Sequence, residues 1–280
     1  MNLFLSVGAM KAGTTWLYSL LEKHPELYFT PEKEIHFLNN YYVNKNILRD
    51  EYRLNQAKNR LKSNSTNHIG VYKMYARWYA MYLEKPVDYR WYERLFSLNN
   101  NKKKYNCDFS NLSCHLDINH WEDCKKKFEN IKIIYVLRDP LGRLWSHIKF
   151  HHQFSGKGDE YLKWNETDFR NFLYKKFIIE NTTYGKYITT MKRVFSSDEF
   201  KVFYFEDFNK SPENELFKLE EFLGISHHSF EGKNLHKKIN ASKDVEMPKS
   251  FINASRELCQ AELVSLVKSG ERFHEDWKII

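Results

Sequence analysis

The sequence has 280 residues, 42% hydrophobic and 16% aromatic, which is enough apolar material for a buried core and excludes a disordered chain. Its formal net charge of +8 indicates anionic partners such as nucleotides, nucleic acid, sulfated sugars or membrane surfaces, but does not choose among them. Solvated surface lysines would explain the same charge.

The first predicted elements are a buried strand at Leu3–Val7 and a helix at Thr14–Lys23, joined by a loop of sequence GAMKAGTT at residues 8–15. Glycines let the backbone turn tightly and expose N–H groups, and a helix N-terminus carries partial positive charge, so the loop is suited to bind a phosphate. A glycine turn without a ligand is the alternative. The spacing is similar to the Walker loop GxxxxGK[ST], but Thr14 stands in place of the lysine, and the only lysine of the loop is Lys11.

The segment PEKEIHFL at residues 31–38 places Glu34 and His36 two residues apart between apolar neighbours. In an extended segment, side chains two residues apart point to the same face. A carboxylate held beside Lys11, in a cleft that excludes water, could serve as a general base. A surface cluster of solvated charges is the alternative.

The chain between Tyr41 and Asn106 is predicted to be irregular, aromatic and polar, and a strand is expected at Tyr105–Phe109. Within it, the stretch Tyr72–Phe96 is dense in tryptophan, tyrosine and phenylalanine. These rings could form a wall that binds an acceptor, or they could pack as helical core and lid. We favour packing, because aromatic side chains bury large apolar areas.

The clearest strand signal, IKIIYVL at Ile131–Leu137, is followed directly by Arg138, and Pro140 is expected to open a helix. The planar guanidinium of arginine binds phosphate through two parallel hydrogen bonds. Ser146 lies about two helical turns further on and could converge with Arg138 on one anion. A structural ion pair between Arg138 and Asp139 is the alternative.

A third strand is predicted at Phe200–Phe205, followed by an acidic turn and a helix at Glu213–Leu223. Strands that alternate with helices predict an α/β fold with a central parallel sheet and helices on both faces, of the P-loop nucleotide-binding type. Ligands of such sheets bind at the carboxyl ends of the strands, where both candidate phosphate sites lie. The chain shows no repeat, linker or composition break, so we expect a single domain over residues 1–280.

Residues 11–18 (KAGTTWLY) resemble the 5′-phosphosulfate loop of sulfotransferases that use 3′-phosphoadenosine 5′-phosphosulfate (PAPS), and RDPLGRLWS at residues 138–146 resembles their 3′-phosphate motif. Two separated phosphate sites suit PAPS and do not suit ATP. The resemblance implies that the lysine of the loop contacts the sulfate and the bridging oxygen. The helix start YGKY at residues 184–187 and the late loop NASK at residues 240–243 also resemble the family. By position, the implied PAPS-binding residues are Lys11, Ala12, Gly13, Thr14, Thr15, Trp16, Arg138, Ser146, Tyr184, Ser242 and Lys243.

The sequence KEIHFL resembles the segment KExHFF of glycosaminoglycan-type and related bacterial sulfotransferases, in which the glutamate is the catalytic base. The resemblance implies that Glu34 is the base and that His36 is the second candidate. His115 lies where cytosolic sulfotransferases carry a catalytic histidine, and it ranks lower. These relatives also carry a second lysine that supports the sulfate, which the stretch CDFSNL lacks, so Lys33 or one of Lys102–Lys104 would have to replace it.

We therefore expect an enzyme that transfers a sulfuryl group from PAPS to a hydroxyl or amine of an acceptor, a carbohydrate or other small molecule. The transfer would be an in-line displacement that releases adenosine 3′,5′-bisphosphate and uses no metal. The resemblance implies no role for Arg143, which is expected to be solvated or structural. A P-loop kinase of a nucleotide or small metabolite is the first alternative, but it needs a lysine in place of Thr14 and a carboxylate for magnesium. A nucleic-acid-binding protein is the second, but the basic tracts at Lys102–Lys104 and Lys125–Lys127 are short.

The four cysteines show neither CxxC pairs nor zinc spacing, so no disulfide framework is expected, although one bridge among Cys107, Cys114 and Cys124 is left open. No apolar run approaches the roughly 20 residues of a membrane span. The segment Met1–Val7 lacks the basic flank and the cleavage site of a signal peptide. We expect a cytoplasmic protein, or the lumenal domain of a longer one.

Overall fold

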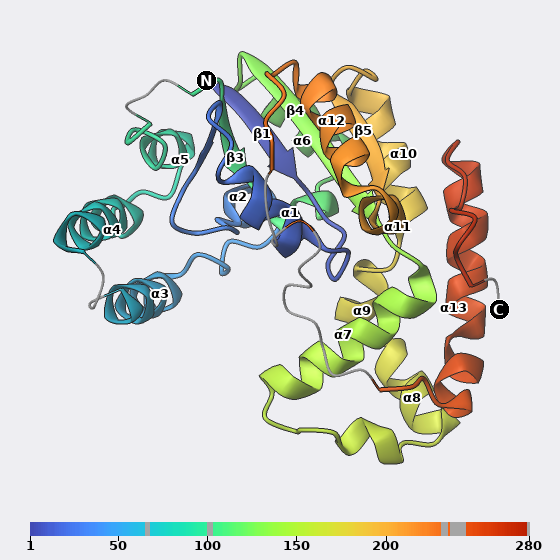
Figure 1. The fold of residues 1–280 in the computed structure, drawn as a ribbon. Helices are drawn as coiled ribbons and strands as arrows, with labels where there is room; N and C mark the ends of the chain where they lie inside the picture. The colour runs from blue at the N-terminus through green and yellow to red at the C-terminus, as the bar shows by residue number, and fades with distance from the viewer. Residues whose placement is uncertain (65–67, 100–102, 231–234, 236–244, 279–280) are drawn as a thin grey trace. The chain divides into compact units, whose positions relative to one another are not determined.

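The structure is a computed structural model that describes residues 1–64, 68–99, 103–230, 235 and 245–278. Within these residues, the strands form one parallel sheet in the order β2-β3-β1-β4-β5, with helices around it (Figure 1). This confirms the α/β class predicted from the alternation of strands and helices. The strands are β1 (Asn2–Ser6), β2 (Leu27–Phe29), β3 (Tyr105–Asp108), β4 (Asn130–Leu137) and β5 (Phe200–Tyr204).

The helices follow the same chain order, and several are short. The first half of the chain holds α1 (Thr14–Leu21), α2 (Phe37–Tyr42), α3 (Asp50–Ser63), α4 (Ile69–Tyr82), α5 (Tyr89–Arg94), the 3-10 turn η1 (Asn111–His115) and α6 (Ile118–Lys125). The second half holds α7 (Pro140–Phe154), the 3-10 turn η2 (Glu160–Lys163), α8 (Glu166–Leu173), α9 (Lys176–Glu180), α10 (Tyr184–Val194), α11 (Phe205–Lys210), α12 (Pro212–Leu223) and α13 (Lys249–Lys268).

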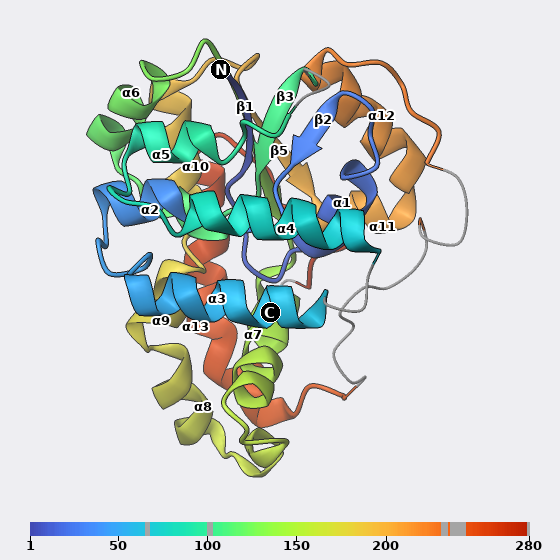
Figure 2. The same ribbon diagram turned by 90° about the vertical axis from the view of Figure 1, so that its left-hand side faces the viewer.

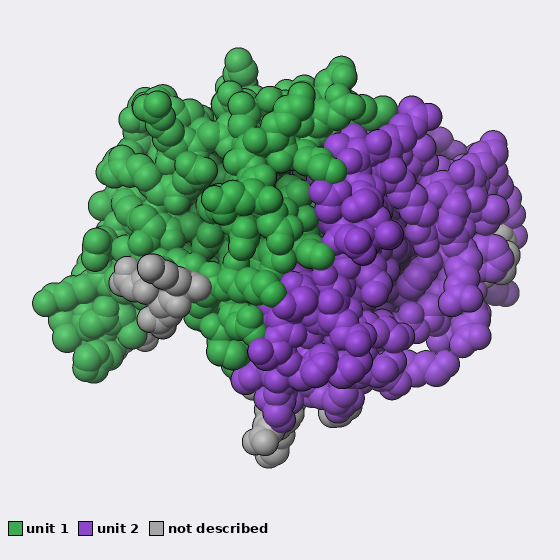
Figure 3. Space-filling view, turned by 90° about the horizontal axis from the view of Figure 1, so that it is seen from above, with its two compact units in different colours: residues 1–7, 21–133 green, residues 8–20, 134–280 purple. Residues whose placement is uncertain are grey.

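The chain forms two compact units, each built from two stretches of sequence (Figure 3). Unit 1 comprises residues 1–7 and 21–133, and unit 2 comprises residues 8–20 and 134–280. The loop at residues 8–13 and the strand end at Arg138 therefore both belong to unit 2, whereas the segment with Glu34 and His36 belongs to unit 1.

In unit 1, β3 pairs in parallel with β1 and with β2, with Phe4 opposite Cys107 and Leu27 opposite Tyr105. Residues 3–6 of β1 are buried, as expected of a strand covered on both faces. Sequence patterns did not predict β2, because three residues are too few to show a period.

The prediction of an irregular region between Tyr41 and Asn106 is wrong, because α3, α4 and α5 lie there. Helix α3 has acidic residues in its first turn and basic residues in its last, which suits the helix dipole, but it buries only Arg53 and Ala57. Without an apolar stripe, its sequence shows no helical period. Helices α3 and α4 lie side by side (Figure 2).

The aromatic residues of this region pack inside unit 1, which confirms the packing interpretation. Trp78 stacks on Tyr82 with ring centroids 5.1 Å apart, and Tyr92 stacks on Phe37 at 4.5 Å. All four rings are at most 2% exposed. Offset stacking of buried rings adds to the free energy gained from their area.

In unit 2, helix α13 packs against α7, α8 and α10 around a core that includes Trp145 and Phe251 (Figure 1). The crossing of α10 and α13 is close, because a Cβ placed on Gly185 would lie 2.3 Å from the carbonyl of Ser265. A glycine at this position lets the two helices meet backbone to backbone.

One further expectation is wrong: the segment after β5 is the helix α11 rather than an acidic turn. Of the two roles expected for Arg143, solvated or structural, the structural one is confirmed, because the side chain is fully buried and its Nη2 donates to Oγ1 of Thr182. The four cysteines are free and buried, and the bridge that the sequence left open is not formed. None of the helices in the described ranges has the length and apolar character needed to cross a membrane.

Candidate functional site

The loop between β1 and α1 is fixed to the neighbouring strand by backbone hydrogen bonds. The Ala9 N–H donates to the Val136 carbonyl at 2.8 Å, and the Val136 N–H donates to the Gly8 carbonyl at 2.9 Å. Lys11 and Gly13 both have left-handed backbones, with φ of 70° and 82°. The loop thus turns sharply into α1, and the N-terminus of that helix, with its partial positive charge, suits an anion.

Phe205, the first residue of α11, lies against this loop. A Cβ on Gly13 would lie 2.6 Å from Cδ2 of Phe205, so only glycine fits there. The Phe205 ring also contacts Arg138, whose guanidinium carbon lies 4.6 Å from the ring centroid. One aromatic ring therefore supports both the loop and the arginine.

Arg138 leaves the carboxyl end of β4 and turns toward the loop. Its Nη1 donates to the Lys11 carbonyl at 2.9 Å, so the two candidate phosphate motifs meet. The expected alternative, an ion pair with Asp139, is not formed. The Asp139 carboxylate instead accepts hydrogen bonds from the N–H groups of Leu141 and Gly142 and caps α7. Among the described residues, Arg138 forms no salt bridge within 4.0 Å, and burial lowers its pKa.

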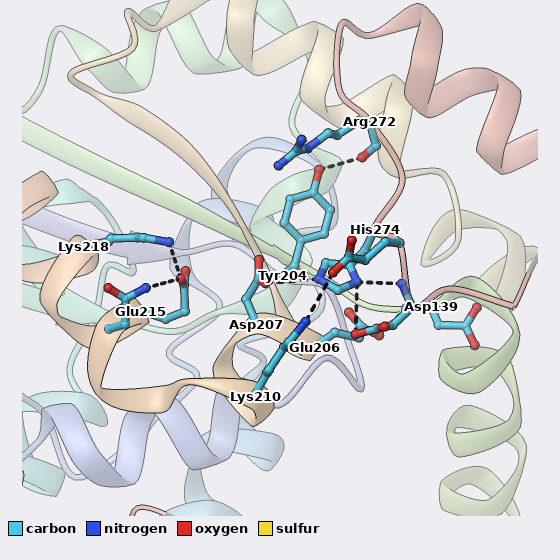
Figure 4. Close-up of polar contacts among 12 residues, drawn as sticks. Asp139, Tyr204, Glu206, Asp207, Lys210, Glu215, Lys218, Arg272 and His274 are labelled. Carbon is cyan, nitrogen blue, oxygen red and sulfur yellow. Dashed lines mark hydrogen bonds and ion pairs between the residues drawn. The ribbon is translucent and has the colours of Figure 1, made fainter.

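A second residue of α11 holds the turn that follows Arg138. Oε1 of Glu206 accepts a hydrogen bond from the Asp139 N–H at 2.9 Å (Figure 4). Next to it, Asp207 contacts His274 at 3.1 Å, and Tyr204 donates to the Arg272 carbonyl at 2.6 Å. The segment after α13 thus anchors the start of α11, which in turn positions the backbone beside Arg138.

Helix α7 supplies the side chains on the far side of Lys11. The Lys11 Nζ lies 4.2 Å from the ring centroid of Phe150, a cation–π contact. Ser146 lies one turn before Phe150 on the same side of the helix and is 9% exposed. Burial, followed by the charges of Arg143 and Lys11, lowers the pKa of His147 to about 3, so this imidazole is neutral at pH 7.

Tyr184, the first residue of α10, contacts the residue that follows β4. Its hydroxyl donates to the Arg138 carbonyl at 3.0 Å, and the side chain is fully buried. Burial raises its pKa above the usual value, so it remains a phenol that holds the backbone of Arg138.

In unit 1, the candidate base lies in a network that the sequence did not reveal. The buried Asp108, at the end of β3, accepts hydrogen bonds from the Ile35 N–H at 3.3 Å and from the Ser110 hydroxyl at 2.5 Å. The same hydroxyl accepts from the His36 N–H at 2.7 Å. Burial raises the pKa of Asp108 to about 6, although these hydrogen bonds oppose the shift. Asp108 and Ser110 therefore fix the backbone on both sides of residue 35.

Glu34 lies between two basic side chains. Oε1 is 2.9 Å from the Lys33 Nζ, and Oε2 is 3.3 Å from Nε2 of His36. Burial lowers the pKa of His36, and the nearby Glu34 only partly offsets this, so the imidazole is neutral at pH 7. Glu34 and His36 lie together, as the spacing predicts, and Lys33 joins them.

Ser242 and Lys243 lie outside the described residues, as does Lys102. The candidate donor residues Lys11, Arg138, Ser146 and Tyr184 gather in unit 2. Within the described parts of the chain, no group of three His, Cys, Asp or Glu side chains could hold a metal ion.

Three contacts of the site were missed from the sequence: those made by Asp108, Phe205 and Glu206. All three residues stand at or directly after a strand end, where ligands of a parallel sheet bind. That rule, applied to β3 and β5 as it was to β1 and β4, would have found them.

A model of the sulfotransferase family matches residues 4–229 of the chain. Among solved structures, a sulfotransferase from Alicyclobacillus acidocaldarius is similar, with a TM-score of 0.63 and 20% identity over 99% of this chain and 98% of that one. The sulfotransferase domain of the Synechococcus PCC 7002 olefin synthase is also similar, with a TM-score of 0.57 and 16% identity over 93% and 94% of the two chains. These likenesses show the fold. A curated protein, the membrane-associated sulfotransferase kil1 of Dictyostelium discoideum, is 46% identical over 41 residues, which are 15% of this chain and only 9% of that protein.

Proposed function

The chain belongs to the sulfotransferase family, and we propose that it transfers a sulfuryl group from PAPS to a hydroxyl or amine of a carbohydrate or other small acceptor. The observation that carries the proposal is Arg138. Its guanidinium is half-buried, forms no salt bridge with a described carboxylate, and is held at 2.9 Å from the carbonyl of Lys11. A desolvated cation needs an anionic partner, and a nucleotide phosphate would supply it.

The donor would be held at two places in unit 2. We assign the 5′-phosphosulfate to the loop, with Lys11, the residues 12–16 that follow it and the hydroxyls of Thr14 and Thr15. We assign the 3′-phosphate to Arg138 and Ser146. Tyr184 is a positioning residue in this proposal, because its hydroxyl is used by the Arg138 carbonyl.

The proposed reaction is an in-line displacement at sulfur. The acceptor oxygen or nitrogen forms a bond to sulfur while the bond from sulfur to the bridging phosphate oxygen breaks, and adenosine 3′,5′-bisphosphate leaves. The ammonium of Lys11 stabilises the charge that develops on the leaving oxygen. We propose Glu34 as the base that takes the acceptor proton, with the neutral His36 as the second candidate. Lys33, 2.9 Å from Glu34, is the candidate for the missing second lysine.

A thermal shift experiment tests the donor assignment. A ligand at 100 times its dissociation constant stabilises the folded protein by about 2.7 kcal/mol, which is readily measured. We expect adenosine 3′,5′-bisphosphate to stabilise the protein. Stabilisation by ATP with magnesium alone would indicate a kinase, and stabilisation by an oligonucleotide alone would indicate a nucleic-acid-binding protein.

The reaction itself is tested with labelled PAPS and a panel of candidate acceptors. Mass spectrometry should find an acceptor that gains one sulfuryl group, and Lys11→Ala should abolish that gain.

We further propose that residues 1–280 act as one sulfotransferase domain. A protein that contains only unit 2, residues 8–20 and 134–280, should then be inactive. Sulfuryl transfer by unit 2 alone would contradict the proposal of a single domain.

A further inference from the structure

A pocket of about 220 Å³ lies in unit 2 at the carboxyl end of α7, apart from the loop and Arg138. Its basic lining comes from His151, His152, Lys157 and Lys175, and its aromatic walls are Trp164 and Phe172. Small-molecule sites in proteins usually hold about 300–1,000 Å³, so this smaller pocket has room for no more than a single ring and its substituents.

The two lysines are available to a ligand. Neither Lys157 nor Lys175 forms a salt bridge within 4.0 Å in the described part of the chain. The Lys175 Nζ lies 5.1 Å from the ring centroid of Phe172, which also lines the pocket. The acidic residue of the lining, Asp168, is already used: its carboxylate accepts from the Asn165 N–H at 3.0 Å in the capping box of α8. The pocket therefore has excess positive charge, which favours an anion.

The two histidines add hydrogen-bonding groups to the lining. His152 is 1% exposed, and its Nδ1 has no partner among the described residues. Burial, followed by the charges of Lys175 and Lys157, lowers the pKa of His151. A neutral imidazole can donate or accept a hydrogen bond without adding charge.

The aromatic walls suit the apolar face of a ring. Trp164 lies 4.8 Å from His152 and 5.4 Å from Phe172, measured between ring centroids. The lining also contains Asn171, whose amide can both donate and accept. Aromatic faces, an amide and ammonium groups that have no carboxylate partner among the described residues together match a sugar that carries a negative charge.

We propose that this pocket binds an acidic sugar unit of the acceptor, a pyranose ring that carries a carboxylate or sulfate group. The inference rests on the proposed function, because it gives the acceptor a second point of attachment. Helix α7 connects the two places: Phe150 contacts the Lys11 Nζ, and His151, the next residue, lines the pocket. An oligosaccharide bound along α7 would place one unit in the pocket and present another for transfer.

The test uses isothermal titration of the full chain with methyl β-glucuronide and methyl β-glucoside, which differ in the carboxylate. We expect the glucuronide to bind and the glucoside to bind at least tenfold more weakly. The double variant Lys157→Ala/Lys175→Ala should lose at least tenfold in glucuronide affinity, because each charge-assisted hydrogen bond is worth about a factor of ten. The matched control is Lys163→Ala/Lys176→Ala, two exposed lysines nearby that do not line the pocket.

Three results would overturn the proposal: equal affinity for the two glycosides, unchanged glucuronide affinity in the double variant, or inorganic sulfate that binds as tightly as the glucuronide. Stabilisation by adenosine 3′,5′-bisphosphate is measured in the same samples. Glucuronide binding without any effect of the bisphosphate would refute the proposed donor and leave the pocket standing. A bisphosphate effect without glucuronide binding would refute the pocket alone.

Discussion

Replacing Arg138 with alanine removes the guanidinium that the proposed function assigns to the 3′-phosphate. A guanidinium donates two charge-assisted hydrogen bonds to a phosphate, each worth about 1.5–3 kcal/mol, so their loss should weaken binding of adenosine 3′,5′-bisphosphate by about 3 kcal/mol or more. This corresponds to at least about a hundredfold increase in its dissociation constant. The affinity for adenosine 5′-monophosphate, which has no 3′-phosphate, should change far less.

The same substitution also affects the folded protein. It removes the 2.9 Å hydrogen bond to the Lys11 carbonyl and the contact with the Phe205 ring. These are worth about 1 kcal/mol each, so the free energy of unfolding should fall by about 2 kcal/mol. The fold should therefore survive, and urea unfolding measures the loss.

Titration calorimetry with the two nucleotides separates the two effects. The monophosphate reports whether the loop is intact, and the ratio of the two affinities reports the 3′-phosphate contact alone. Arg193→Ala, an exposed arginine in the last turn of α10, is the matched control. If Arg138→Ala keeps the wild-type preference for the bisphosphate, Arg138 does not bind the 3′-phosphate.

Three other predictions address the base, the position of Lys11 and the buried acid of α13. Glu34→Gln should lower the rate of sulfuryl transfer about 10²–10⁴-fold with unchanged bisphosphate affinity, and a loss of that affinity would indicate a structural role. Phe150→Ala should lower kcat because Lys11 loses its aromatic support, while Phe150→Tyr should restore it; equal kcat in all three proteins would exclude positioning. Burial raises the pKa of Glu262 to about 8, above its unfolded value, so the stability of the folded state is full at low pH and falls as pH rises through 8. In the wild type, the free energy of unfolding should fall by about 4 kcal/mol between pH 5 and pH 9 because of this group, as measured by urea unfolding. Glu262→Gln, which can still accept from the Gly185 N–H, should remove this loss. An unchanged dependence of the unfolding free energy on pH would show that Glu262 is not its cause.

The strands β1, β4 and β5 could be predicted from the sequence, because they are runs of apolar or β-branched residues that end in a change of composition. The two phosphate motifs follow such strands, so their meeting at the sheet edge was also predictable. Arg138 then lies at the Lys11 carbonyl because parallel strands bring their carboxyl ends together.

Helix α3, the role of Phe205 and the burial of Arg143 could not be predicted, because tertiary packing rather than a local sequence pattern determines them. Helix α3 buries almost nothing, so its sequence carries propensity and charge order but no period. The role of Phe205 arises from two contacts with residues 192 and 67 positions away, and no local pattern encodes it. Arg143 was expected to be solvated or structural because a single sequence does not show which face of α7 turns inward.

The two contacts of Phe205 make three residues that are distant in the sequence, Gly13, Arg138 and Phe205, depend on one another. A larger residue at position 13 would push the ring away, a smaller one at position 205 would leave Arg138 without a platform, and neither change can be tolerated while the other two residues stay as they are. Changing the donor that the proposed function assigns to this protein would therefore require these positions to be varied together. A single replacement would disturb the loop or the position of Arg138 without giving a site for a different donor.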